Sequence, residues 1–203
     1  MEMKIARMIS YLFHPLLMPC YILIILLNLD SIASLSVPLT YKLTLTGVVL
    51  LMTVILPLLF TWLLMKVQYI TSIFITTKEE RVYPILSIAI FYYATYYLLK
   101  EVHISAIFSY YMLGATLVAI LALIINFYRK ISLHMLGIGS FTGLFLGLSL
   151  NFGINFTTEI ITGILLAGVI GYSRLKPNAH QPSDVYSGFL TGAVVLAALL
   201  FLL

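Results

Sequence analysis

Charged residues and cysteines are scarce in this 203-residue chain, and each scarcity excludes a class of protein. Charged residues make up 9% and hydrophobic residues 62%, which excludes an ordinary water-soluble domain. The single cysteine, Cys20, excludes an intramolecular disulfide and a thiolate metal cluster within one chain. The net charge of +4 comes without a basic stripe on a soluble face, so we expect contacts with lipid headgroups and no nucleic-acid partner.

Long uncharged runs predict the fold class. Five runs hold about the 18 to 20 residues that a membrane-spanning helix needs. They are 43–65, 82–99, 104–128, 135–158 and 185–203. A shorter sixth run, 160–173, spans if Glu159 sits at the headgroups. We therefore expect an all-α, polytopic membrane helical bundle with six core transmembrane helices, which forms one domain over 1–203 with an N-terminal segment, 1–42, and a helical core, 43–203.

The N-terminal segment contains a further apolar run, 8–29, that proline interrupts. His14-Pro15 and Pro19 lie within it, and a proline removes a backbone donor that lipid cannot replace. We expect no cleaved leader, because no soluble mature domain follows. Three structures stay open for this run: an interfacial helix, a re-entrant helix, or a seventh spanning helix.

Small residues recur every four positions in three of the expected helices. The three sets are Gly139, Gly143 and Gly147; Gly163, Ala167 and Gly171; and Gly188 with Gly192. This spacing lets helix backbones approach closely in a membrane. We expect the three helices to pack together, and the same interfaces would also suit a homodimer.

Three clusters of polar residues are expected to lie on one membrane face. They are Lys78 to Arg81, Ser132 to His134, and Ser173 to Asp184. Two expected helices separate each cluster from the next, so the chain returns to the same face each time. Together the clusters supply guanidiniums, imidazoles, hydroxyls and a carboxylate. Two histidines and an aspartate could instead ligate zinc, but the nearby guanidiniums would repel a cation and favour an anion.

The second and third clusters resemble signatures of a known enzyme family. The third reads Ser173-Arg174, five residues, His180, three residues and Asp184. This spacing resembles the third signature of the type 2 phosphatidic acid phosphatase family. The group Ser132-Leu133-His134 is similar to the family's proline-serine-glycine-histidine signature, with serine and histidine in register and with proline and glycine missing.

The first cluster departs further from the family pattern. The family places a lysine seven residues before an arginine–proline pair, whereas here Lys78 and Arg81 precede Pro84 at other spacings. The basic character of the cluster survives. Arg81 is the better match as a phosphate clamp, because a bidentate guanidinium suits two phosphate oxygens, and Lys78 is a substitute at a different spacing. The alternative for this cluster is a solvated turn with local ion pairs.

The resemblance implies an activity and a role for each matching residue. Members of the family are phosphatases that hydrolyse phosphate esters through a phosphohistidine, without a metal or another cofactor. By this resemblance His180 would attack phosphorus, Asp184 would orient its ring, and His134 would protonate the leaving oxygen and then activate water. The phosphate-binding residues would be Arg174, Arg81, Lys78, Ser132, Leu133 and Ser173. His14 and His103 fit no part of the pattern, and we expect structural or interfacial roles for both.

A site at the membrane surface favours an amphiphilic substrate whose tail stays in the bilayer. The family resemblance admits phosphatidic acid, phosphatidylglycerol phosphate, lipid A phosphates and polyprenyl diphosphates. The additional cations Arg129, Lys130 and Lys176 would suit a diphosphate. The alternative function is that of a catalytically inactive anion- or lipid-binding membrane protein, or a small transporter, which binds phosphate and hydrolyses no ester.

The distribution of basic residues bears on which face of the cell membrane carries the site. If 8–29 crosses, nine of the eleven Lys and Arg residues lie on the face of the clusters, and the positive-inside rule places that face in the cytoplasm. If 8–29 does not cross, Lys4 and Arg7 change sides. With the three cluster cations set aside, the count is then four against four. We favour this second arrangement, with an extracytoplasmic active site.

Cysteines introduced singly into the loop 67–77 test this sidedness. The loop directly precedes the first polar cluster and lies on the same face, which we expect to be extracytoplasmic. An impermeant thiol reagent should therefore label these cysteines in intact cells. The parent protein, whose thiol is Cys20, gives the background. Protection of every loop cysteine in intact cells, followed by labelling after permeabilisation, would place the site in the cytoplasm instead.

Overall fold

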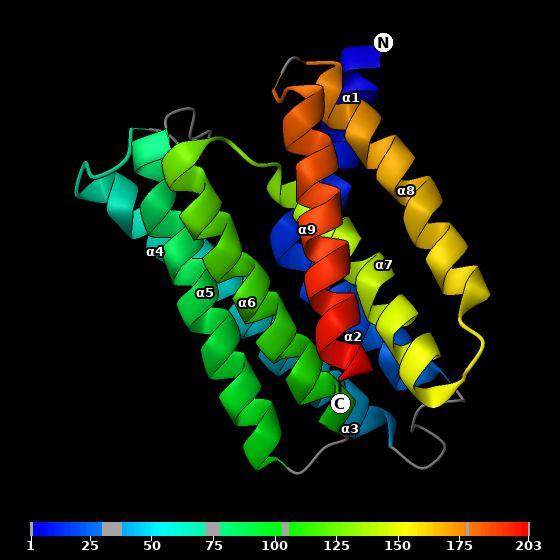
Figure 1. Cartoon of the computed structure of the whole chain (residues 1–203). Coiled ribbons are helices and arrows are strands. Elements are labelled where there is room, and N and C mark those ends of the chain that lie inside the picture. The colour runs from blue at the N-terminus through cyan, green and yellow to red at the C-terminus, as the bar shows by residue number, and fades with distance from the viewer. Residues whose placement is uncertain (1, 30–37, 72–77, 103–105, 178, 203) are drawn as a thin grey trace. The chain divides into compact units, whose positions relative to one another are not determined.

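The computed structural model describes residues 2–29, 38–71, 78–102, 106–177 and 179–202, and these residues form helices and no strand (Figure 1). Seven helical segments are long and apolar enough to cross a membrane, which confirms the predicted all-α, polytopic helical bundle. They are Glu2–Asn28, Leu39–Lys66, Glu79–Glu101, Ala106–Tyr128, Leu133–Phe152, Thr157–Leu175 and Pro182–Phe201. His103 lies outside the described residues.

Contacts between helices divide the chain into two compact units, and each is described by itself. Unit 1 consists of Met1–Met18 and Lys130–Leu203, and unit 2 consists of Pro19–Arg129. The predicted single domain over 1–203 stays a prediction. The second and third polar clusters belong to unit 1, and the first cluster belongs to unit 2.

The N-terminal segment is broken at His14. It consists of α1 (Glu2–Leu12), a short 3-10 turn, η1 (Pro15–Leu17), and α2 (Met18–Asn28). His14 has an extended backbone, as expected before a proline, and its Nδ1 accepts a hydrogen bond from Leu16 N at 3.4 Å. Helices α1 and α2 have 11 residues each, so each is about 16 Å long and neither crosses a hydrocarbon core of about 30 Å alone.

A proline also shapes the next helical segment, which lies in unit 2. It runs through α3 (Leu39–Leu50), a π-helical turn, η3 (Leu51–Ile55), and α4 (Leu56–Lys66). Pro57 is the second residue after the wide turn, and in an α-helix its ring would collide with the carbonyl of Thr53. The wider turn relieves this collision and keeps the segment continuous.

Helices α5 (Lys78–Glu101) and α6 (Ala106–Tyr128) make the most extensive helix contact of unit 2. Their buried hydroxyl groups donate to carbonyls of their own helices. The pairs are Ser87 with Pro84, Thr95 with Phe91, and Thr116 with Met112. These hydroxyl groups are thereby satisfied locally, which suits an apolar surrounding.

Unit 1 is built around α7 (Leu133–Phe152), the helix with the largest buried share, which packs against α8 (Thr157–Leu175) and α9 (Pro182–Phe201). Gly153 ends α7 in a left-handed conformation, with φ of 66°, and its N–H donates to Ser149 O. The apolar run 135–158 therefore contains the end of α7 and the loop that leads into α8, rather than one helix.

Glycines bring the backbones of α7 and α9 into direct contact. A Cβ atom added to Gly139 would overlap the carbonyl oxygen of Phe189, and one added to Gly143 would overlap the carbonyl oxygen of Ala193. From the other side, a Cβ on Gly192 would overlap the carbonyl oxygen of Leu136. On α8, a Cβ added to Gly163 would overlap the side chain of Thr142 in α7, whereas one on Gly171 would make ordinary contacts with Val185 of α9 and Met135 of α7. The predicted close packing of these three helices is confirmed.

Replacing Gly143 with alanine should destabilise unit 1, because the added methyl group would force α7 away from α9. Overpacking of this kind costs about 1 to 3 kcal/mol. Gly168→Ala on α8 is the matched control, since a Cβ there meets nothing within 4 Å. After heating in detergent, size-exclusion chromatography should show a lower midpoint for loss of monodisperse protein in Gly143→Ala alone. Equal midpoints for the two variants would contradict the close backbone contact.

Candidate functional site

The second and third polar clusters meet at one end of unit 1. Ser132 directly precedes α7, Arg174 lies in the last turn of α8, and Asp184 lies in the first turn of α9. Figure 1 shows the end of α8 beside the start of α9. The backbone N–H of Ser132 donates to the carbonyl of Asp184 at 3.3 Å, which fixes the start of α7 against the start of α9.

His180 and Asp184 form the pair that the sequence predicts. The distance from His180 Nδ1 to Asp184 Oδ2 is 3.4 Å, and the two side chains are 8% and 12% exposed. The same carboxylate oxygen accepts from the backbone N–H of Gln181 at 3.1 Å, which holds it at the start of α9. Because a carboxylate accepts, the proton of this contact lies on Nδ1, and Nε2 of a neutral His180 keeps its lone pair.

Two buried polar atoms in this cluster have no hydrogen-bond partner within the part of the chain that the structure describes. They are the hydroxyl oxygen of Ser132 and Nε of Arg174. Ser132 is fully buried and does not cap α7 with its side chain. Leaving such a group unsatisfied costs about 1 to 3 kcal/mol. Both groups can donate, so the oxygen atoms of a bound anion would satisfy them.

Leu133 contributes its backbone to the same end of unit 1. It is the first residue of α7, so its N–H is one of the four that an α-helix leaves without an internal acceptor. The N-terminus of a helix also attracts negative charge through its dipole. This amide matches the phosphate-binding role that the family resemblance implies for Leu133.

His134 lies in the first turn of α7 and contacts the N-terminal segment. Its Nε2 is 3.0 Å from the backbone carbonyl oxygen of Ser10, and its ring packs edge-on against His14 with the ring centroids 5.7 Å apart. The charges of Arg174, His14 and His180 all act on the His134 ring. His134 and His180, the two histidines of the predicted mechanism, belong to the same unit.

Ser173 is fully buried, and its hydroxyl is already engaged. It donates to the carbonyl of Ile170 at 2.7 Å and lies 3.3 Å from the hydroxyl of Ser10. A hydroxyl has one proton, so in this arrangement Ser173 has none left for a phosphate oxygen. Its contacts support the end of α8, next to Arg174.

Lys78 and Arg81 of the first cluster belong to unit 2, which is described by itself. Lys78 begins α5, and its side chain lies outside the described residues. Arg81 lies in the first turn of the same helix and is half-buried. Their predicted phosphate contacts stay predictions.

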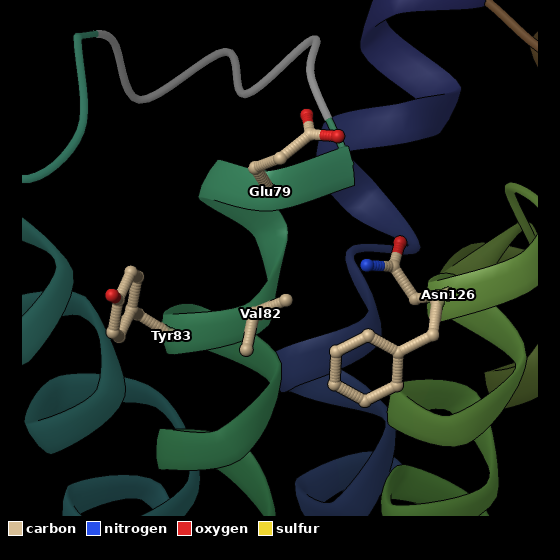
Figure 2. A pocket seen from close by; sticks show the side chains of 5 residues that line it. Glu79, Val82, Tyr83 and Asn126 are labelled. Atoms are coloured by element: carbon tan, nitrogen blue, oxygen red, sulfur yellow. The ribbon is translucent and has the colours of Figure 1, made fainter.

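A hollow of about 310 Å³ lies between the start of α5 and the end of α6 (Figure 2). Its described lining consists of Glu79, Val82, Tyr83, Asn126 and Phe127, and this lining holds one carboxylate and no basic side chain. A negative and largely apolar wall does not suit a phosphate. This hollow therefore gives no support to a phosphate site within unit 2.

Lys176 follows α8 and forms an ion pair with Glu2 of α1. The hydrogen bond and the charge of the Glu2 carboxylate raise the pKa of Lys176 above its usual value. Its ammonium group is therefore shared with a carboxylate, which weakens the predicted contribution of Lys176 to binding a diphosphate.

Ser10 and His14 are the neighbours of the site that the sequence analysis missed. His14 caps η1, which agrees with the structural role expected for it, but it also packs on His134. No motif marks either residue: Ser10 lies near the end of α1, and His14 follows that helix.

Comparison with known proteins gives one short similarity. No family model and no solved structure matches the chain. A stretch of 43 residues is 51% identical to a curated protein described as "Uncharacterized 22.5 kDa protein in cps region" from Klebsiella pneumoniae. The match covers 21% of this chain and 21% of that protein, so the chain aligns with about a fifth of the relative's length.

Substituting Arg174 by lysine should weaken the binding of inorganic phosphate about 10- to 100-fold, as expected for hydrogen bonds to a charged group. A guanidinium donates to Ser10 and to an anion from N–H groups at fixed angles, whereas the single ammonium group of a lysine cannot reproduce both bonds in that geometry. Lys100→Gln is the control, since Lys100 is an exposed basic residue in the last turn of α5, in unit 2. Calorimetric titration of the purified protein measures both affinities. An unchanged affinity in Arg174→Lys would exclude Arg174 from the anion site.

Proposed function

We propose that this protein is a phosphatase that removes phosphate from membrane lipids through a phosphohistidine intermediate. The observation that carries the proposal is the cluster at one end of unit 1. There a carboxylate-paired histidine, His180, and a second histidine, His134, lie at the same end of unit 1 as two buried donors that have no described partner, Ser132 Oγ and Arg174 Nε. An oriented nucleophile, a proton carrier and a charge-stabilising cradle are the groups that phosphate ester hydrolysis requires together.

The surroundings favour a lipid substrate. The helices of unit 1 expose large apolar side chains along their lengths, as helices in contact with lipid do. Examples are Ile161, Ile164, Leu165, Leu190 and Val194. A phosphate bound where these helices end would let an attached acyl or prenyl tail remain in the bilayer. We propose phosphatidic acid, phosphatidylglycerol phosphate, lipid A phosphates or polyprenyl diphosphates as the substrate class.

In the first chemical step Nε2 of His180 attacks phosphorus. A bond forms between Nε2 and phosphorus while the bond from phosphorus to the ester oxygen breaks, and a protonated His134 gives its proton to that leaving oxygen. Asp184 accepts from Nδ1 throughout and stabilises the charge that develops on the His180 ring. Arg174 and Ser132 donate to the non-bridging oxygens as their charge shifts.

In the second step water releases the phosphate. The neutral His134 takes a proton from a water molecule as its oxygen attacks phosphorus, and the bond from phosphorus to His180 breaks. Inorganic phosphate leaves, and His180 recovers its Nε2 lone pair. Each histidine therefore returns to its starting protonation state after one turnover.

We further propose that the basic cluster of α5, with Arg81 and Lys78, contributes cations to the same phosphate, as the family resemblance implies. The site is proposed to open on the extracytoplasmic face.

Replacing His180 with alanine should abolish phosphate release from short-chain phosphatidic acid and from a polyprenyl diphosphate, with purified protein and a chelator present. His134→Ala should also impair turnover, and Asp184→Asn should lower kcat about 10- to 100-fold because the ring loses its charged acceptor. With ³²P-labelled substrate, the wild type should carry an acid-labile, base-stable label that His180→Ala lacks.

His103→Ala serves as the matched control, because this histidine is expected outside the site and should be dispensable. Far-UV circular dichroism and size-exclusion chromatography verify that each variant folds. Full turnover by a folded His180→Ala variant would refute the proposed nucleophile. Phosphate binding without any hydrolysis by the wild type would favour the alternative, an anion- or lipid-binding protein or small transporter, and loss of activity with chelator would favour a metallophosphatase.

A further inference from the structure

We propose that Ser10 of α1 is a positioning residue of the phosphate site. Its hydroxyl orients the Arg174 guanidinium, and its backbone carbonyl selects Nδ1 of His134 as the nitrogen that exchanges protons with the substrate. The inference rests on the proposed phosphatase function and adds to it an element that lies outside the three sequence clusters. It makes the N-terminal helix a wall of the active site.

The hydroxyl of Ser10 lies in a chain of hydrogen bonds whose direction is fixed. Arg174 Nη1 donates to Ser10 Oγ at 3.1 Å, and Ser173 Oγ donates to the carbonyl of Ile170 at 2.7 Å. Because Ser173 has already used its proton, the 3.3 Å contact between the two hydroxyls requires Ser10 to donate and Ser173 to accept. Ser10 is therefore both acceptor and donor, and its single proton is used.

This chain determines how Arg174 meets an anion. The guanidinium is planar and rigid, so a bond at Nη1 fixes the directions of its other N–H groups. Nε is buried and has no partner among the described residues, although Nη1 of the same group is bonded. Ser10 thus accepts from Nη1 of the guanidinium and leaves the Nε–H to donate to a phosphate oxygen.

The backbone carbonyl of Ser10 acts on the second histidine. A carbonyl oxygen only accepts, so the 3.0 Å contact places a proton on Nε2 of His134. In the neutral ring the lone pair then lies on Nδ1. With Nε2 occupied, proton transfer to the leaving oxygen and from water passes through Nδ1.

Other contacts of α1 hold Ser10 in this place. Residues four apart share a face of a helix, and Ser10 shares one with Ala6 and Glu2. Ala6 is 1% exposed, and Glu2 pairs with Lys176 at the end of α8. Beyond the end of α1, His14 packs on His134. These contacts hold α1 against the end of α8 and the start of α7.

Ser10→Ala and Ser10→Thr, compared with wild type, test the proposal. Alanine removes the hydroxyl but keeps the carbonyl, so Arg174 loses its anchor while His134 keeps its contact. We expect kcat/KM for short-chain phosphatidic acid and affinity for inorganic phosphate to fall about 10- to 100-fold, as for a hydrogen bond to a charged group. The pH dependence of kcat should stay unchanged, and threonine should restore both quantities.

Tyr11→Phe is the matched control, because it deletes a hydroxyl from the next residue of α1, which is 60% exposed. This variant should behave as the wild type. ¹⁵N NMR of histidine-labelled protein should show His134 protonated on Nε2 in wild type and in Ser10→Ala. A general loosening of α1 would shift the pH dependence and would not be rescued by threonine.

The outcomes separate the positioning role from the phosphatase function. If the wild type hydrolyses substrate and Ser10→Ala matches it in kcat/KM and phosphate affinity, the role of the hydroxyl is refuted while the phosphatase stands. If the wild type hydrolyses nothing but Ser10→Ala binds phosphate more weakly and Ser10→Thr does not, the phosphatase fails while the orientation of Arg174 by Ser10 stands. A His134 ring protonated on Nδ1 and not on Nε2 would overturn the selection of Nδ1.

Discussion

The direct contact between the backbones of α7 and α9 is the constraint on which unit 1 depends. Gly139 and Gly143 lie against carbonyl oxygens of α9, and a side chain of any size would separate the helices. Near the same end, Gly188 of α9 leaves room for the carbonyl of Ser132. The hydrogen bond from Ser132 N to the Asp184 carbonyl forms because the helix starts are this close. Helix packing thereby sets the geometry of the polar cluster.

Much of the fold follows from the sequence because lipid leaves few alternatives. Uncharged runs of sufficient length predict the spans, and small residues four apart predict which helices approach closely. The ends of the spans are less predictable from composition. Gly153 ends α7 inside an apolar run, because the left-handed conformation that stops the helix is a local backbone choice that hydrophobicity does not encode.

The candidate site is predictable where its residues are close in sequence. His180 and Asp184 are four residues apart at the start of a helix, so their spacing alone indicates their contact. Ser10 meets Arg174 from 164 residues away, through a hydroxyl and a carbonyl that have no distinctive sequence context. Such contacts depend on how α1 docks, which a list of motifs does not specify. The relation of Arg81 to this cluster depends on tertiary arrangement in the same way.

The wide turn of η3 explains how one side of a long helical segment stays inward. Leu45, Val49, Thr53 and Pro57 are all buried and follow one another at intervals of four residues. In a regular α-helix, twelve residues advance the angular phase by three full rotations and about 120° more, so the last of these side chains would point well away from the first. A π turn needs more residues per rotation and cancels much of that drift. The π turn that accommodates Pro57 therefore also keeps these four buried residues on one side of the segment.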